Sequence, residues 1–135
     1  MTLEEYIRLP HRWQWGFTDC TLFAADWVVA ATGKDPGAEL RGTYFDAAGA
    51  AAILRASGGA ERLVGAKLSA LGFHRIQVPR DGDIGMVRAM TGFDAAGISI
   101  KEIPAIRFGP LWAVMSARGA MVKHLEWTGV AWRIA

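Results

Sequence analysis

Cysteine is almost absent from this sequence: Cys20 is the only one among 135 residues. A single cysteine cannot form an internal disulfide, so a disulfide-stabilised extracellular scaffold is excluded. The chain must instead be stabilised by its own core, and its length is sufficient for one core without a metal or a crosslink. We therefore predict one domain over residues 1–135, synthesised in a reducing cytosol.

Long apolar runs and a marked excess of one charge are also missing. No run approaches the roughly 18 apolar residues that a membrane span needs, and the opening "MTLEEYIRLP" carries two glutamates where an export signal carries basic residues. The 15 basic and 13 acidic residues give a net charge of only +2. These features predict no membrane insertion, no export signal and no nucleic-acid partner.

Motifs for bound groups are lacking as well. The three histidines and one cysteine show no zinc-ligand spacing, and there is no phosphate-binding loop and no serine nucleophile elbow. We predict no metal and no cofactor. What the sequence has in abundance is apolar residues, at 52% with six tryptophans. That richness predicts some apolar surface that contacts a partner.

The N-terminal half contains four segments with helical capping signals. Thr2 with Glu5 and Thr43 with Asp46 have capping-box spacing, and Asp19 is placed to cap the helix that ends at Gly33. The predicted helices cover residues 2–9, 20–32, 43–57 and 60–71.

The C-terminal half contains short runs rich in valine, isoleucine and aromatic residues, separated by turn signals. The predicted strands cover residues 73–78, 84–90, 96–100, 112–117, 120–127 and 130–135, and "RFGPL" at 107–111 is predicted to be a loop. Helices followed by strands indicate an α+β domain in which N-terminal helices pack on a C-terminal antiparallel sheet.

Cys20 occupies the first turn of the second predicted helix, directly after Asp19. Free amide groups and the helix dipole favour a thiolate there, which is the nucleophilic form of cysteine. An isolated cysteine in an apolar helix is also a common core residue. Position alone leaves both interpretations open.

The run "DCTLFAADW" resembles the nucleophile motif of NlpC-type papain-like cysteine peptidases, with Asp19, Cys20 and Phe23 at the matching places. "RDGDIGMVR", with Gly82 and Asp83, resembles the segment that begins the sheet of that family, and "AAGISI" and "WAVMSARGAMVKHLEWTGVAW" resemble its later strands. The resemblance spans about residues 12 to 134 in the same order. It implies a papain-like fold with Cys20 in the nucleophile position.

The same resemblance implies that the partners of the nucleophile are replaced. Matching "AAGI" to the family's second strand puts Ala95 in the position of the catalytic histidine, and the residue that orients this histidine falls at Met115, with Ser116 next to it. Neither alanine nor methionine accepts a proton. A helix dipole of about 1 kcal/mol lowers a thiol pKa by less than one unit, whereas an imidazolium lowers it by several. The resemblance therefore implies a degenerate site.

Three histidines remain as alternative bases for Cys20: His11, His74 and His124. His124 is the strongest candidate, because a late strand of the sheet can carry it toward the helix of Cys20. Exposed or structurally bonded histidines are nevertheless the common case.

Two other groups of residues have two interpretations each. Trp13 and Trp15 either line a groove near Cys20 or cover the helix and the sheet, and the second is favoured. Asp81 and Asp83 flank Gly82 and suggest either paired carboxylates or a turn, and the turn is favoured.

The resemblance extends to short prophage-encoded domains that are found among the tail genes of phages and gene-transfer agents. It implies a structural or assembly protein of the tail tip, made in the bacterial cytoplasm and assembled into the virion, with other tail proteins as partners. The alternative is an active cysteine peptidase or amidase that uses Cys20 to cut peptidoglycan peptides during phage entry.

Overall fold

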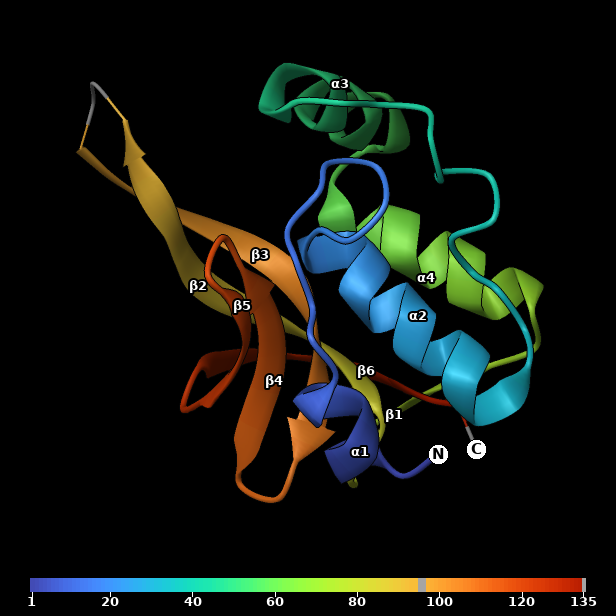
Figure 1. Ribbon diagram of the computed structural model, residues 1–135. Helices are drawn as coiled ribbons and strands as arrows, with labels where there is room; N and C mark the ends of the chain where they lie inside the picture. Colours follow the sequence, from blue (N-terminus) through green and yellow to red (C-terminus); the bar gives the residue numbers. More distant parts are fainter. Residues whose placement is uncertain (95–96, 135) are drawn as a thin grey trace.

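The computed structural model describes residues 1–94 and 97–134, which form four helices followed by six strands. The helices are α1 (Leu3–Arg8), α2 (Cys20–Thr32), α3 (Ala47–Ser57) and α4 (Ala60–Ala70). The strands are β1 (His74–Ile76), β2 (Ile84–Asp94), β3 (Gly97–Phe108), β4 (Leu111–Ser116), β5 (Gly119–Lys123) and β6 (Glu126–Arg133). The predicted α+β class is confirmed (Figure 1).

Local capping fixes the ends of the first two helices. The Thr2 hydroxyl accepts a hydrogen bond from the Glu5 amide at 3.1 Å, so α1 begins where the capping box predicted. Asp19 caps α2, and Gly33 ends it in the left-handed conformation at φ 78°. Such a φ suits glycine, which has no Cβ to clash.

The third helix begins later than predicted. Its N-cap is Asp46, whose carboxylate accepts from the Gly49 amide at 2.7 Å. Thr43 does not cap it, because the Thr43 hydroxyl donates instead to the Leu40 carbonyl at 2.7 Å. The prediction of a helix from residue 43 was therefore wrong by four residues.

The strands form one antiparallel sheet in the order β1-β6-β2-β3-β4-β5. Strand β3 is much longer than predicted, since it continues through residues 101–106 to Phe108. The predicted loop at 107–111 is only a turn at Gly109 and Pro110 between β3 and β4. The β2–β3 hairpin projects beyond the rest of the sheet (Figure 1).

The segment predicted as one strand over 120–127 is two strands. β5 ends at Lys123 and β6 starts at Glu126, so His124 and Leu125 form the connection between them. The prediction that His124 lies on a strand was wrong. Its position in a connection leaves the His124 side chain exposed.

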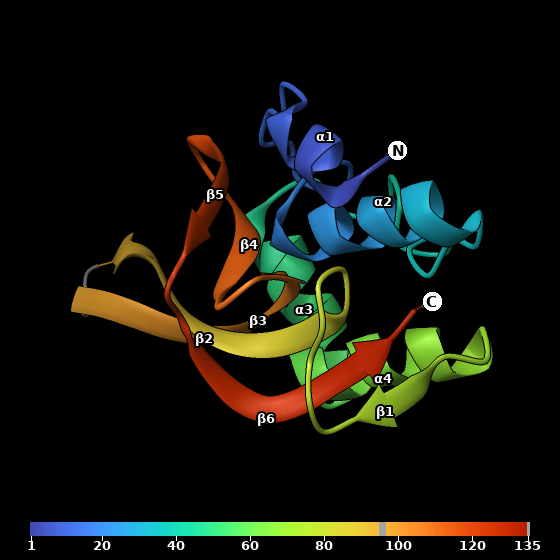
Figure 2. The same cartoon turned by 90° about the horizontal axis from the view of Figure 1, so that it is seen from below.

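The helices lie along one side of the curled sheet (Figure 2). Helix α2 contributes Phe23, Trp27 and Val28 to the main core, and alternate strand residues such as Met86 and Met115 face them. This confirms that N-terminal helices pack on the sheet. Within the described residues, no helix combines the length and the apolar character that crossing a membrane requires.

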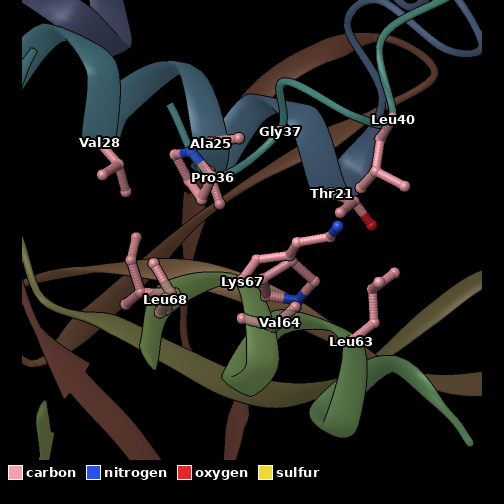
Figure 3. A pocket seen from close by; sticks show the side chains of 13 residues that line it. Thr21, Ala25, Val28, Pro36, Gly37, Leu40, Leu63, Val64, Lys67 and Leu68 are labelled. Carbon is pink, nitrogen blue, oxygen red and sulfur yellow. The ribbon is translucent and has the colours of Figure 1, made fainter. Parts of the chain in front are cut away.

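A small cavity of about 30 Å³ remains between α2, α4 and the segment at residues 36–40. Figure 3 shows the Lys67 side chain extending from α4 across this gap, and its ammonium group bonds Glu39 at 3.0 Å. The other lining groups are mainly apolar, including Val28, Val64 and Leu68. The cavity holds little more than a water molecule, so it is a packing gap and not a ligand site.

Candidate functional site

A much larger cleft, of about 1020 Å³, lies between the N-terminal end of α2, helix α3 and the strands β2 to β5. Cys20 lines it at the entrance to α2. Ligand-binding clefts usually measure about 300–1000 Å³, so this one is at the upper limit for a small molecule and has room for a peptide segment. It contains the residue that the sequence singled out, and it is the candidate site.

The carboxylate of Asp19 anchors the entrance of α2. Its Oδ1 accepts from the amides of Thr21 at 3.1 Å and Leu22 at 3.0 Å, and its Oδ2 accepts from the Gly16 amide at 3.0 Å and from the hydroxyl of Tyr44. Only 1% of Asp19 is exposed. Four donors use the hydrogen-bonding capacity of this carboxylate, so it holds the structure together and has little capacity left for a ligand.

The environment of Cys20 favours a neutral thiol. Burial raises the pKa of the Cys20 thiol from its ordinary 9.0 to about 11, and the negative charge of Asp19 contributes in the same direction. Hydrogen bonds in the first turn of α2 oppose the shift without cancelling it. The helix dipole that predicted a thiolate is therefore outweighed by desolvation and by the neighbouring carboxylate.

The strand residues that pack directly against Cys20 are apolar. The thiol side chain packs against a cluster whose members are Val87, Ala89, Ile103, Ala105, Trp112 and Val114. Three of these, Ala89 on β2, Ile103 on β3 and Val114 on β4, also line the cleft. None of them can accept a proton from sulfur.

The resemblance assigned the missing partners of Cys20 to Ala95 and Met115. Ala95 is outside the described residues. Met115 lines the cleft from β4, but its side chain belongs to the core that faces the helices, whereas its neighbour Val114 joins the cluster against Cys20. Successive strand residues point to opposite faces, so Met115 and Val114 contact different clusters although they are adjacent in the sequence. The Ser116 hydroxyl also lines the cleft and donates to the Gly119 carbonyl at 2.9 Å.

All three histidines belong to the described part of the chain, and none lines the cleft. His124 is exposed, although its neighbours Lys123 and Leu125 are lining residues. The Nε2 of His11 lies 2.7 Å from the Tyr6 carbonyl oxygen, and its ring packs on Phe23. The structure thus brings Cys20 to the cleft and does not bring an imidazole to it.

Trp13 and Trp15 lie at the cleft and also pack on the core, whereas the aspartate pair flanks a turn. Trp13 and Trp15 line the cleft and meet edge to face with ring centres 5.0 Å apart, while each also packs on a core cluster. Gly82 lies in a turn at φ 89°, and Asp83 accepts from the Arg80 amide at 2.8 Å and pairs with Arg133 at 3.0 Å.

Among residues 1–90 and 100–134, whose side chains the structure describes, no three acidic, histidine or cysteine side chains gather closely enough to hold a metal ion. Sequence reasoning missed Tyr44, which supports Asp19 from a loop 25 residues away. It also missed Ile103, because residues 101–106 were not recognised as a strand. The short continuous apolar run "IPAI" at 103–106 was the available signal, since such a run is consistent with a strand buried on both faces.

Comparison with known proteins identifies a family but assigns no activity. No curated protein and no solved structure matches the chain significantly. A family model matches residues 2–134, almost the whole sequence. The chain therefore belongs to the family described as Domain of unknown function (DUF6950).

Proposed function

We propose that this protein is a non-catalytic domain with a papain-like, NlpC-type fold that serves as a structural or assembly protein of a phage or gene-transfer-agent tail. The order of elements supports the fold: a cysteine at the start of a helix is followed by an antiparallel sheet that packs against that helix. The resemblance to short prophage domains supports the tail. The cleft supplies a surface for a partner.

The observation that carries the loss of catalysis is the surroundings of the Cys20 thiol. Cysteine hydrolysis needs a base that forms the thiolate and an acid that protonates the leaving group. Here Ile103 and Val114 share the cleft with the thiol, and its pKa is raised to about 11. A site that suppresses the thiolate and is lined by none of the three histidines does not support acyl transfer.

Alkylation kinetics of the folded protein test this proposal. At pH 7.5 a thiol of pKa 11 is ionised about 100-fold less than one of pKa 9, and the greater nucleophilicity of the more basic thiolate offsets only part of this difference, so iodoacetamide should modify Cys20 at least about tenfold more slowly than a free cysteine peptide. The rate should rise continuously up to pH 10. A rate equal to that of the free peptide, or a plateau below pH 8, would revive the peptidase alternative.

A second experiment addresses assembly. When the gene for this protein carries the Cys20→Ser mutation, the yield of assembled tails should equal that of the wild type, because the thiol takes part in no reaction. Cys20→Ser particles that assemble but no longer penetrate the peptidoglycan layer would contradict the non-catalytic interpretation.

A further inference from the structure

Helix α3 is unusual because none of its residues is buried. It spans 11 residues, and most of them are apolar: "AAGAAAILRAS". A surface helix normally buries an apolar stripe against its own domain. Ala50, Ile53 and Leu54 are partly buried against a cluster that includes residues of α2 and α4, and the same three residues line the cleft together with Ala47 and Ala51. These mostly small side chains form one wall of the cleft, and strands β2 to β5 contribute other lining residues.

The charged groups around the cleft are predominantly positive. Five charged residues line it, and two of them are negative. Asp19 is buried and fully hydrogen-bonded, and Glu102 lies 3.6 Å from the Arg88 guanidinium. The other three are Arg55, Lys101 and Lys123, whose side chains are exposed.

Among residues 1–90 and 100–134, whose side chains the structure describes, no carboxylate lies within 4.0 Å of the charged nitrogens of these three cations, since the ion pairs there involve other basic residues. The cations come from three different elements, namely α3, β3 and β5. An apolar cleft is therefore surrounded by positive charge that the domain itself does not neutralise. Such a potential selects for a partner of the opposite sign.

We propose that this cleft docks an acidic, apolar peptide segment of a partner protein, with its carboxylates at Arg55, Lys101 and Lys123 and its apolar side chains against α3, Ile103 and Trp15. This inference deepens the assembly role proposed above and rests on it. The volume favours a peptide over a single small molecule, because about 1020 Å³ is at or beyond the usual range for small ligands. Laying apolar side chains in a groove with charges at the rim is a common mode of peptide recognition.

The test is fluorescence anisotropy of a dye-labelled octapeptide of alternating leucine and glutamate, titrated with the full chain. Saturable binding is expected, and it should weaken as salt is raised because the rim charges are exposed. Two matched probes separate the contributions: one replaces every glutamate by lysine, and the other replaces every leucine by serine. Both should bind at least about tenfold more weakly.

Two charge-reversed variants with the same net charge locate the site. Lys101→Glu with Lys123→Glu should weaken binding of the acidic probe at least about tenfold, whereas Arg8→Glu with Arg75→Glu, on exposed residues outside the cleft, should leave it within about twofold. Ala51→Arg adds a long side chain to the cleft-facing side of α3 and should block the probe while keeping the helix, since arginine is a good helix former. The circular dichroism of each variant reports whether it is folded.

Several outcomes would overturn the proposal: equal binding of the lysine probe, equal losses in the two charge-reversed variants, or full binding by folded Ala51→Arg. Laurate that displaces the probe and binds more tightly would identify an acyl chain as the occupant instead. Mass spectrometry of the probe after incubation separates this inference from the proposed function. An intact but unbound peptide refutes only the docking site, whereas a peptide cut by the wild type and not by Cys20→Ser refutes the absence of catalysis.

Discussion

Replacing Asp19 by alanine should lower the free energy of unfolding by about 4 kcal/mol. Loss of a helix N-cap alone costs about 1 kcal/mol. The Asp19 carboxylate also accepts from the buried Gly16 amide and from the hydroxyl of Tyr44, and both donors would be left without a partner inside the protein. Each stranded buried donor costs about 1–3 kcal/mol, so the combined loss exceeds that of an ordinary cap severalfold.

Two control variants isolate the contributions. Asp46→Ala removes the cap of α3, an exposed carboxylate bonded to one amide, and should cost only about 0.5–1 kcal/mol. Tyr44→Phe removes one of the four donors to Asp19 and should cost about 1.5 kcal/mol, because the acceptor is charged. In the Tyr44→Phe background, Asp19→Ala should cost about 1–2 kcal/mol less than in the wild type, since the hydroxyl is no longer stranded.

Urea unfolding followed by circular dichroism at pH 7 measures these free energies. The isosteric variant Asp19→Asn gives a second, independent readout, since loss of the negative charge should lower the pKa of Cys20 below 11 while burial keeps it above 9. Ultraviolet titration of the thiolate measures that shift. A cost of Asp19→Ala no greater than that of Asp46→Ala, or an unchanged thiol pKa in Asp19→Asn, would refute this account of the entrance to α2.

Further predictions concern pH, packing and the start of the sheet. The pKa of Cys20 is raised in the folded state, so the unfolded chain loses the thiol proton at lower pH. The contribution of this thiol to the free energy of unfolding should therefore be fully present below pH 9 and fall by up to about 2 kcal/mol between pH 9 and 11. Cys20→Ser should remove the part of this decrease that lies between pH 9 and 10, where the tyrosines do not yet contribute. Gly85→Ala should lower the midpoint of thermal unfolding and cost about 1–3 kcal/mol, because its Cβ would lie 2.5 Å from a ring atom of the buried Trp112. Asp83→Asn should cost about 2 kcal/mol in urea unfolding, because it breaks the pair with Arg133 at a carboxylate that is 3% exposed, and a change under 0.5 kcal/mol would contradict it.

Helix ends were predictable because their determinants are local. Thr2, Asp19 and Gly33 act on amides and carbonyls within four residues along the chain. Thr43 shows where this reasoning fails, because its hydroxyl donates to the carbonyl of Leu40 and Asp46 caps the helix instead. That choice depends on how the preceding loop folds, which capping spacing does not encode.

The strand at residues 101–106 was missed because it contains Lys101, Glu102 and Pro104, which single-sequence reasoning assigns to loops. Pro104 pairs with Met86 of β2, whereas β4 pairs only with residues 106–108. At Pro104, β3 therefore has a neighbouring strand on one side only, and a missing amide hydrogen is tolerated on the open side. Strand pairing decided this, and pairing is a non-local property.

The sequence by itself determined the class of the fold and the place of its one thiol at the first turn of a helix, because apolar periodicity and capping act over a few residues. Only the tertiary structure decided what surrounds that thiol. Ile103 and Val114 come from strands more than 80 residues away, the carboxylate of Asp19 is held by Tyr44, and three cations from three elements meet around one cleft. Burial and charge at a site are sums over neighbours in space, so they become readable only once the chain has folded.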